Sequence, residues 1–212
     1  MAGDTVRAGR AQATRDAILT AAERLFAEHG VITVSNRQIS EAAGQGNNTA
    51  VGYHFGTKAD LVRAIVRRHT DELERLRDRM VADAGDSTDL RVWVACLVRP
   101  ATEHLAELGS PTWFARCAAQ MMADPELRSV IIEEALSTPG LRAVLDGINR
   151  CVPDLPAPIR AERDEMARHL IVQMTAERER ALAENRPTPR ASWRDAASGL
   201  IDAIVAILKT KP

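Results

Sequence analysis

The sequence predicts an all-α protein with a small N-terminal domain and a larger helical-bundle C-terminal domain. Apolar residues recur at intervals of three and four between capping residues, which is the spacing of amphipathic helices. No strand-length alternation of apolar and polar residues interrupts this pattern. The 212 residues, 45% of them hydrophobic, are enough to bury a core without disulfides or a structural metal.

Two helices are predicted near the N-terminus. The first begins near Thr14 and ends at Gly30, a residue suited to the left-handed conformation that follows many helices. The second begins at Ser35, whose side chain is expected to form a capping box with Gln38, and it ends at Gly44.

A third short helix is predicted from Thr49 to His54, and Thr57 is expected to cap a fourth helix that extends to about residue 80. Short helices joined by a glycine-containing turn are typical of a helix-turn-helix. Beyond residue 84 prolines separate longer helices, two of which are predicted at 158–184 and 192–209. The expected N-caps with proline at the first helical position are Ser110-Pro111, Asp124-Pro125 and Thr138-Pro139.

The chain therefore divides into a basic arm at 1–13, a helix-turn-helix domain at 14–60 and a larger helical domain at 61–212. The arm carries Arg7 and Arg10, with Arg15 just beyond it, and either contacts a DNA groove or backbone or forms a solvated tail.

Three sequence blocks in the N-terminal part carry a specific resemblance. They are AILTAAERLFAEHG (17–30), RQISEAAG (37–44) and YHFGTKADL (53–61). In this order and at this spacing they resemble the DNA-binding domain of the tetracycline-repressor (TetR) family, over roughly residues 12–70. The resemblance implies a bacterial transcriptional regulator, most often a repressor, that binds operator DNA as a homodimer and releases it when a small-molecule effector enters the C-terminal domain.

One feature departs from the commonest family pattern. Between Gly44 and Tyr53 the sequence has one residue more, and Gly52 takes the position where many members carry a tyrosine. The segment resembles instead a branch of the family with Asn-Asn-(Ser/Thr)-Ala-Val at this place.

Polar side chains around the second and third helices are expected to contact DNA. Paired amide groups such as those of Asn47 and Asn48 suit bidentate reading of adenine, although Asn47 equally suits a cap of the third helix. Hydroxyl groups and cations near helix N-termini suit phosphate contacts. The expected DNA-contacting residues are Ser35, Arg37, Asn47, Asn48, Thr49, Tyr53, His54 and Lys58. Packing on the domain is the alternative role for Tyr53 and His54, and Phe55 is expected in the core.

Apolar stripes on the last two predicted helices suggest an isologous four-helix dimer interface, which is also where the family resemblance places it. The alternative is that both stripes face their own subunit. The expected interface residues are Leu170, Ile171, Met174, Leu200, Ile201, Ile204 and Leu208.

A second apolar face, on the middle helices, is a candidate effector pocket. Met and Cys are adaptable pocket liners, and Arg116 suits an anionic group, so we expect a mostly apolar effector. The alternative is that this face is ordinary core, with Arg116 reaching solvent. The candidate pocket residues are Trp93, Cys96, Trp113, Arg116, Cys117, Gln120 and Met121.

Other function classes have little support in the sequence. The five histidines form no metal-binding spacing, and no Gly-x-Ser-x-Gly elbow or phosphate-binding loop occurs, so we expect no enzyme, no cofactor and no metal. The three cysteines are expected to be reduced, buried thiols, with redox sensing or metal binding as the alternative. No apolar stretch is long enough for a membrane span and the N-terminus has no apolar signal segment, so a cytoplasmic location is expected. The alternative function is a regulator whose C-terminal domain binds a protein or that activates transcription.

Overall fold

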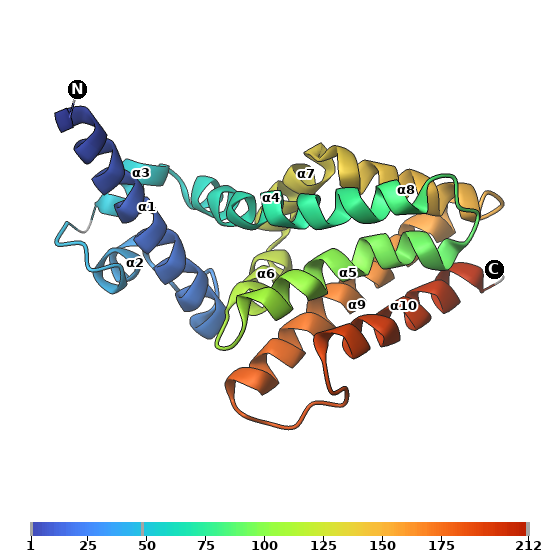
Figure 1. Cartoon of the computed structure of the whole chain (residues 1–212). Coiled ribbons are helices and arrows are strands. Elements are labelled where there is room, and N and C mark those ends of the chain that lie inside the picture. The colour runs from blue at the N-terminus through green and yellow to red at the C-terminus, as the bar shows by residue number, and fades with distance from the viewer. Residues whose placement is uncertain (1, 48, 211–212) are drawn as a thin grey trace.

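The computed structural model of the chain describes residues 2–47 and 49–210, with side chains from residue 8 onward (Figure 1). Within these ranges the chain forms ten helices and no strand, so the all-α prediction is confirmed. The helices are α1 (Ala2–His29), α2 (Asn36–Ala42), α3 (Ala50–Phe55), α4 (Lys58–Ala84), α5 (Leu90–Leu108), α6 (Phe114–Ala123), α7 (Pro125–Ser137), α8 (Pro139–Cys151), α9 (Ala157–Ala183) and α10 (Trp193–Lys209).

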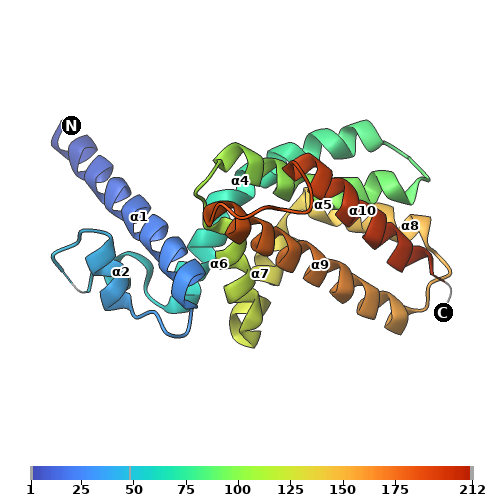
Figure 2. The same cartoon turned by 90° about the horizontal axis from the view of Figure 1, so that it is seen from below.

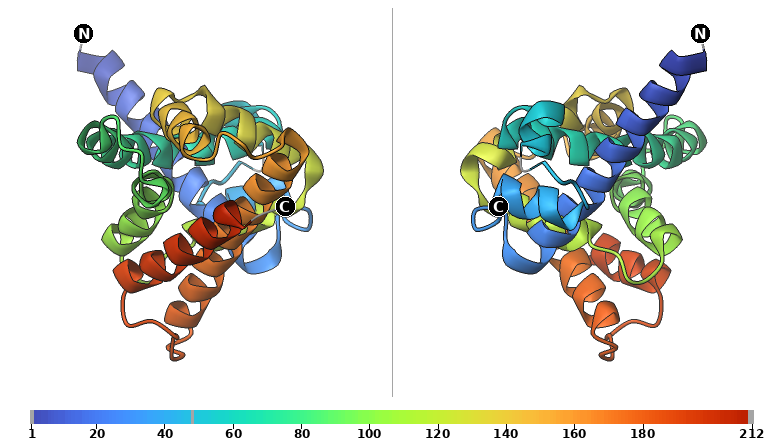
Figure 3. Two further views of the ribbon diagram at one scale, coloured as in Figure 1. Left: turned by 90° about the vertical axis from the view of Figure 1, so that its right-hand side faces the viewer. Right: turned by 90° about the vertical axis from the view of Figure 1, so that its left-hand side faces the viewer.

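The molecule is elongated, with a small group of helices at one end and a larger helical body beside it (Figure 1). Helices α1, α2 and α3 lie together at this end, and α4 leads from them into the body formed by α5–α10 (Figure 1). The N-terminal part of α1 projects beyond the body, and the two chain ends lie far apart (Figures 2 and 3). Helices α9 and α10 lie side by side along one face of the body.

Local capping explains where the helices of the small group begin. Ser35 accepts a hydrogen bond from the backbone N–H of Gln38, while the Gln38 side chain accepts one from the backbone N–H of Ser35, which confirms the predicted capping box. Thr57 and Asp60 form the same arrangement at the start of α4. Gly44 has a φ of +68°, a conformation that favours glycine, so the chain leaves α2 as predicted.

The structure corrects two predicted helix starts. Helix α1 begins at Ala2 rather than near Thr14, so the predicted arm is a helical extension, and the side chain of Arg7 lies outside the described residues. The extension is rich in alanine and arginine, which are strong helix formers. Helix α6 begins at Phe114 and not at Pro111, whereas the starts predicted at Asp124-Pro125 and Thr138-Pro139 are confirmed.

Two large apolar cores hold the molecule together. The first is centred on side chains from α1–α4, and three residues from α6 and α7, namely Cys117, Met121 and Leu127, pack into the same cluster. The second joins α5, α8, α9 and α10. The predicted boundary after residue 60 falls in the first turn of α4, so the helix-turn-helix unit and the larger helical region are joined through a continuous helix and a shared core.

Two of the three cysteines are buried as predicted, and the third is not. Cys96 and Cys117 are buried free thiols, and Cys151 is half-buried and also free. No helix in the described ranges combines the length and the apolar character needed to cross a membrane. Among those same residues, no group of three or more His, Cys, Asp and Glu side chains is arranged to hold a metal ion.

Candidate nucleic-acid interface and the cavity behind it

Helix α3 turns its apolar side chains inward and its polar side chains outward. Val51 and Phe55, one turn apart, are buried in the first core, whereas Tyr53 on the opposite face is 85% exposed. The Tyr53 ring touches only the edge of the His54 ring, with the centroids 5.1 Å apart. The alternative that Tyr53 packs on the domain is therefore wrong, and the expected burial of Phe55 is confirmed.

The turn before α3 is organised by Asn47. Its side-chain Oδ1 accepts hydrogen bonds from the backbone N–H and the hydroxyl of Thr49, at 3.0 and 2.7 Å. Thr49 itself is the N-cap residue of α3 and makes no side-chain capping bond. Asn47 thus acts in the turn that starts the helix, which matches the capping alternative, and Asn48 lies outside the described residues.

The two predicted residues of the α2 N-terminus differ in their freedom to contact DNA. The Ser35 hydroxyl donates to Gln38 Oε1 at 2.8 Å and is occupied by the cap. Arg37 is exposed and pairs with Glu41 at 2.8 Å, one turn further along α2. Exposed pairs of this kind are worth less than about 1 kcal/mol, so Arg37 can exchange Glu41 for a phosphate.

The side chain of Lys58 is held by hydrogen bonds within the protein and does not extend into solvent towards DNA. Its Nζ donates to the carbonyl oxygens of Val31 and Val34, at 2.8 and 2.9 Å, and so closes the turn between α1 and α2. Burial lowers the pKa of Lys58, which its proximity to Asp124 partly offsets. The predicted phosphate contact of Lys58 is therefore corrected: the ammonium group already serves two buried carbonyls.

The predicted effector-pocket residues do not converge. Trp93 and Cys96 of α5 are buried in the second core, whereas Cys117 and Met121 of α6 are buried in the first. The Trp93 ring fills the space above Gly147, where a Cβ atom would lie 2.1 Å from it. These positions correct the predicted pocket, because α5 and α6 turn their apolar faces to different neighbours.

The other three predicted pocket residues are also placed elsewhere. Trp113 packs against the edge of the first core and lines a hollow beside α1 and α2. Gln120 is half-buried near Gly30, at the end of α1. Arg116 is buried, and it neither faces an effector cavity nor reaches solvent.

Arg116 forms a buried ion pair that sequence reasoning missed. The Glu179 carboxylate on α9 accepts hydrogen bonds from the backbone N–H groups of Ala115 and Arg116 and from Arg116 Nε, at 2.9–3.1 Å. Glu179 is 2% exposed, and its burial raises the pKa while these hydrogen bonds lower it. The carboxylate thus caps α6 from another helix, which explains why α6 does not start at the locally predicted cap.

A different cavity, partly open to solvent, lies in the helical body between α5, α7, α8, α9 and α10. Its volume is about 610 Å³ and its lining is mostly aliphatic, with Arg128 and Asp164 among the few charged groups. The signal for it in the sequence is the helical spacing of Leu141, Leu145 and Ile148 on α8, which all line the cavity. A volume of this size and lining fits a small apolar molecule.

Comparison with known proteins identifies the N-terminal unit. Residues 18–65, which contain α2, α3 and the adjoining parts of α1 and α4, match the family model described as bacterial regulatory proteins, tetR family. The helix-turn-helix unit belongs to this family. The chain is therefore a DNA-binding transcriptional regulator, as the sequence predicted.

Curated relatives in the family are also regulators. The chain is 27% identical over 188 residues to the HTH-type transcriptional repressor LfrR of Mycolicibacterium smegmatis, an alignment that covers 81% of this chain and 91% of LfrR. It is 39% identical over 79 residues to the HTH-type transcriptional regulator TtgR of Pseudomonas putida, over 37% of this chain and 35% of TtgR.

Solved structures of TetR-type regulators share the fold. SmeT, the repressor of the Stenotrophomonas maltophilia multidrug efflux pump SmeDEF, aligns over 92% of this chain and 90% of its own, with a TM-score of 0.57 and 22% identity. The TetR-family regulator PfmR from Thermus thermophilus aligns over 92% of this chain and 98% of its own, with a TM-score of 0.52 and 19% identity. The architecture of a helix-turn-helix domain joined to a helical C-terminal domain is thus common to the three chains.

A buried polar cluster joins the DNA-binding unit to the helical body. His69 on α4 contacts Glu23 of α1 through Nε2, at 3.0 Å, and His104 of α5 through Nδ1, at 2.8 Å. Phe114 of α6 packs on the His69 ring, with the centroids 4.1 Å apart. When both histidines are neutral, His69 Nε2–H donates to Glu23, and so His104 Nε2–H must donate to His69 Nδ1.

The His104 side chain is expected to make stability depend on pH. Burial and the neighbouring His69 lower the pKa of His104 from 6.5 to about 4, against the smaller opposing effects of Glu72 and Glu23. The unfolded chain therefore takes up this proton at higher pH than the folded chain, so stability falls as the pH drops from 6.5 towards 4. The loss from this group is at most about 3 kcal/mol.

Urea unfolding between pH 4 and pH 7.5 measures this dependence. His104→Gln keeps a donor near the position of Nε2 but does not titrate, so the variant is expected to lose less stability over this range than the wild type. His29→Gln is the matched control, because the His29 side chain is 60% exposed. Equal pH profiles for His104→Gln and the wild type would contradict the assignment.

The predicted dimer residues divide between two sides of α9 and α10. Leu200, Ile201, Ile204 and Leu208 are at most 7% exposed within the chain, which corrects their assignment to the interface. Ile171 is half-buried and lines the cavity in the helical body, so its place in the interface stays a prediction.

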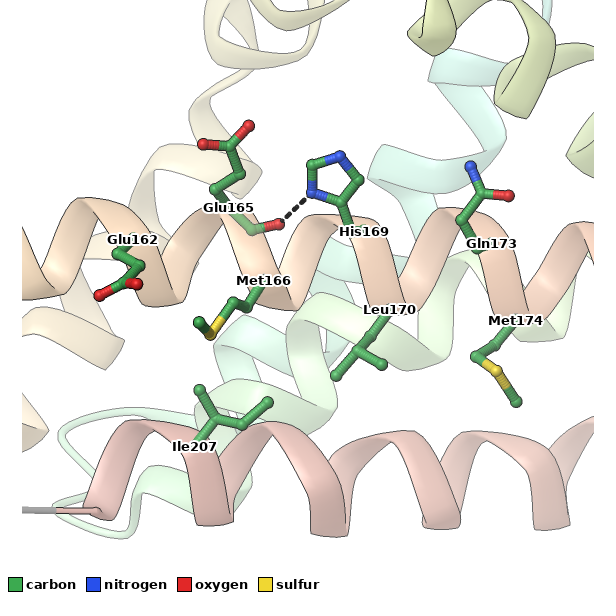
Figure 4. Close-up of a pocket in the computed structure, with 8 residues that line it drawn as sticks. All are labelled: Glu162, Glu165, Met166, His169, Leu170, Gln173, Met174 and Ile207. Atoms are coloured by element: carbon green, nitrogen blue, oxygen red, sulfur yellow. Dashed lines mark hydrogen bonds between the residues drawn. The ribbon is translucent and has the colours of Figure 1, made fainter.

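Leu170 and Met174 lie instead on an outer groove between α9 and α10, together with Met166, Ile207 and His169 (Figure 4). Met166 is 45% exposed and Met174 is 52% exposed. The spacing of residues 166, 170 and 174 by one helical turn each is the signal that could have found this face.

Proposed function

We propose that this TetR-family regulator is a homodimeric repressor that binds a palindromic operator and releases it when an apolar small molecule enters the cavity in its helical body. The exposed polar tip of the helix-turn-helix is the single observation that carries the DNA-binding part of the proposal. It consists of α3, held from behind by Val51 and Phe55, with Tyr53 presented outward. The similarity to the repressor LfrR over most of both chains supports repression.

The proposed DNA-contacting residues are a revised set. Tyr53 is exposed on α3, His54 beside it is half-buried, and Arg37 holds an exchangeable surface pair with Glu41. Ser35 and Lys58 are left out because their polar groups serve the α2 cap and the turn after α1. The set is Arg37, Asn47, Asn48, Thr49, Tyr53 and His54, of which Asn48 lies outside the described residues.

Dimerisation is proposed through the outer groove between α9 and α10. Exposed apolar side chains gathered on one face of a chain usually mark an interaction surface. A second copy of the same groove provides an apolar partner by two-fold symmetry. Two helix-turn-helix units are needed because each reads only one half-site, and the half-sites lie about 34–36 Å apart.

Ligand binding in the cavity is proposed to act on the DNA-binding unit through α7 and α4. Ile132 and Ala135 of α7 line the cavity, and Glu134 between them holds Arg63 and Arg67 of α4 at 2.9 and 2.8 Å. A ligand that shifts α7 therefore pulls on α4, whose first turn adjoins α3. A coupling of about 1–3 kcal/mol changes operator affinity roughly 5- to 150-fold.

Selection of bound duplexes from a random pool, followed by gel shifts on the selected operator, tests the proposal. A palindromic site is expected, and Tyr53→Ala is expected to weaken binding about tenfold, which corresponds to roughly 1.4 kcal/mol. Leu108→Ala is the matched control, because Leu108 is also exposed but lies at the C-terminal end of α5, outside the helix-turn-helix. Absence of any duplex preference at low salt would overturn the DNA-binding proposal.

The same gel shift tests ligand release. The small-molecule fraction of a cell extract is expected to dissociate the operator complex in a dose-dependent way. If only the protein fraction of the extract changes the complex, the proposed small-molecule effector is wrong and a protein partner takes its place.

A further inference from the structure

A second hollow, far from the cavity in the helical body, lies between α1 and α4 on the DNA-binding unit. Its volume is about 600 Å³, and it is bounded at one end by His54 and Phe55 of α3. Arginines line both walls: Arg15 comes from α1, and Arg63, Arg67 and Arg68 come from α4. We call this hollow the arginine cleft.

The carboxylates near the arginine cleft are mostly engaged. Asp60 accepts hydrogen bonds from Thr57 in the α4 capping box and from Arg63 at 3.0 Å, and its pKa is lowered, first by the Thr57 hydroxyl. Asp16 accepts from the side chain of Gln12 at 3.0 Å. Glu134 neutralises Arg63 and Arg67 from the α7 side.

Two arginines on opposite walls remain without a carboxylate partner among the residues that the structure describes. Arg68 Nη1 donates to the Thr20 hydroxyl at 2.9 Å. Arg15 Nη1 donates to the carbonyl oxygen of His54, and its guanidinium lies 4.3 Å from the centre of the Phe55 ring. A guanidinium has five N–H donors, so most donors of both groups are free to bind a ligand in the cleft.

We propose that the arginine cleft binds a phosphate-type oxyanion between Arg15 and Arg68. The planar donor fork of arginine matches the oxygens of a phosphate, and the four arginines that line the cleft outnumber its two aspartates, Asp16 and Asp60. The phosphate belongs either to a free phosphorylated molecule or to the backbone of bound DNA. Because Arg15 also holds the end of α3, an anion that bridges the two walls ties α1 and α3 to α4 and stabilises one arrangement of the DNA-binding unit.

Calorimetric titration of the full-length protein with inorganic pyrophosphate, without DNA, tests the free-anion source. Arg68→Gln is the variant, because Arg68 is exposed and bonds only to the Thr20 hydroxyl. Arg79→Gln is the matched control, with the same charge change on an exposed part of α4 about 16 Å further along the helix. The wild type and Arg79→Gln are expected to bind pyrophosphate, and Arg68→Gln about tenfold more weakly.

Gel shifts on the selected operator at several salt concentrations test the DNA source. If pyrophosphate does not bind but Arg68→Gln weakens operator binding and lowers the salt slope by about one relative to Arg79→Gln, the bound phosphate belongs to DNA. The proposal is overturned if pyrophosphate binds to Arg68→Gln as tightly as it binds to the wild type, or if Arg68→Gln matches Arg79→Gln in both assays. A failure of the proposed operator binding remains distinguishable, because the calorimetric titration contains no DNA.

Discussion

Glu179→Ala is expected to lower the free energy of unfolding by about 3–5 kcal/mol, because it leaves the buried Arg116 guanidinium without its counter-ion. It also leaves the backbone N–H groups of Ala115 and Arg116 without their acceptor at the start of α6. Urea denaturation followed by circular dichroism measures the loss. Glu177→Ala is the matched control on the same helix, because Glu177 is exposed and forms only a surface pair with Arg180.

A second variant tests whether the lost stability comes from the unpaired charge of Arg116 or from lost apolar packing. Replacing Arg116 by Met together with Glu179 by Leu removes both charges and keeps apolar volume, so the pair of changes is expected to restore much of the stability that Glu179→Ala loses. The assignment is contradicted if Glu179→Ala costs no more than Glu177→Ala.

Met166→Arg combined with Met174→Arg is expected to convert the proposed dimer into a monomer. Both side chains are about half exposed on the outer groove, so the changes leave the cores untouched, but they place two extra cations per subunit where the copies would meet (Figure 4). Operator affinity is then expected to fall by roughly 10²–10⁴-fold, since the second half-site no longer binds within the same complex. Sedimentation equilibrium and gel shifts measure the two effects.

Ala123→Arg combined with Ser129→Arg is the matched control for this experiment. Both positions are exposed on α6 and α7, away from the outer groove, and the change in net charge is the same. The control is expected to remain dimeric and to bind the operator like the wild type. A monomeric wild-type protein, or a dimeric groove variant with full operator affinity, would refute the proposed interface.

The starts and ends of the helices from α2 to the first turn of α4 could be predicted closely from the sequence. Helices α2 and α4 start at side-chain caps whose two partners lie three residues apart, as with Ser35 and Gln38. The turns use glycines at positive φ, as at Gly30 and Gly44. Such features depend on residues close in the chain, so they can be identified without knowledge of the tertiary structure.

The candidate sites in the helical body could be predicted much less well. Helix α9 has two apolar faces, one with Ala167 and Ile171 toward the inside and one with Met166 and Met174 toward the outside. Periodicity shows that such faces exist but does not show which of them a neighbouring helix will cover. The dimer prediction therefore mixed residues from both faces, and the pocket prediction combined residues from two separate cores.

Local sequence was thus sufficient to establish the helical class, the helix-turn-helix, the family and the outward position of the polar tip. The tertiary structure alone decided the roles of Lys58, Arg116 and Glu179, because their partners come from other helices or turns. It also decided where the cavity in the helical body and the arginine cleft lie, since their walls come from helices far apart in the chain. The physical reason is that caps and turns are satisfied within a few residues, whereas buried charges and cavities depend on which helices pack together.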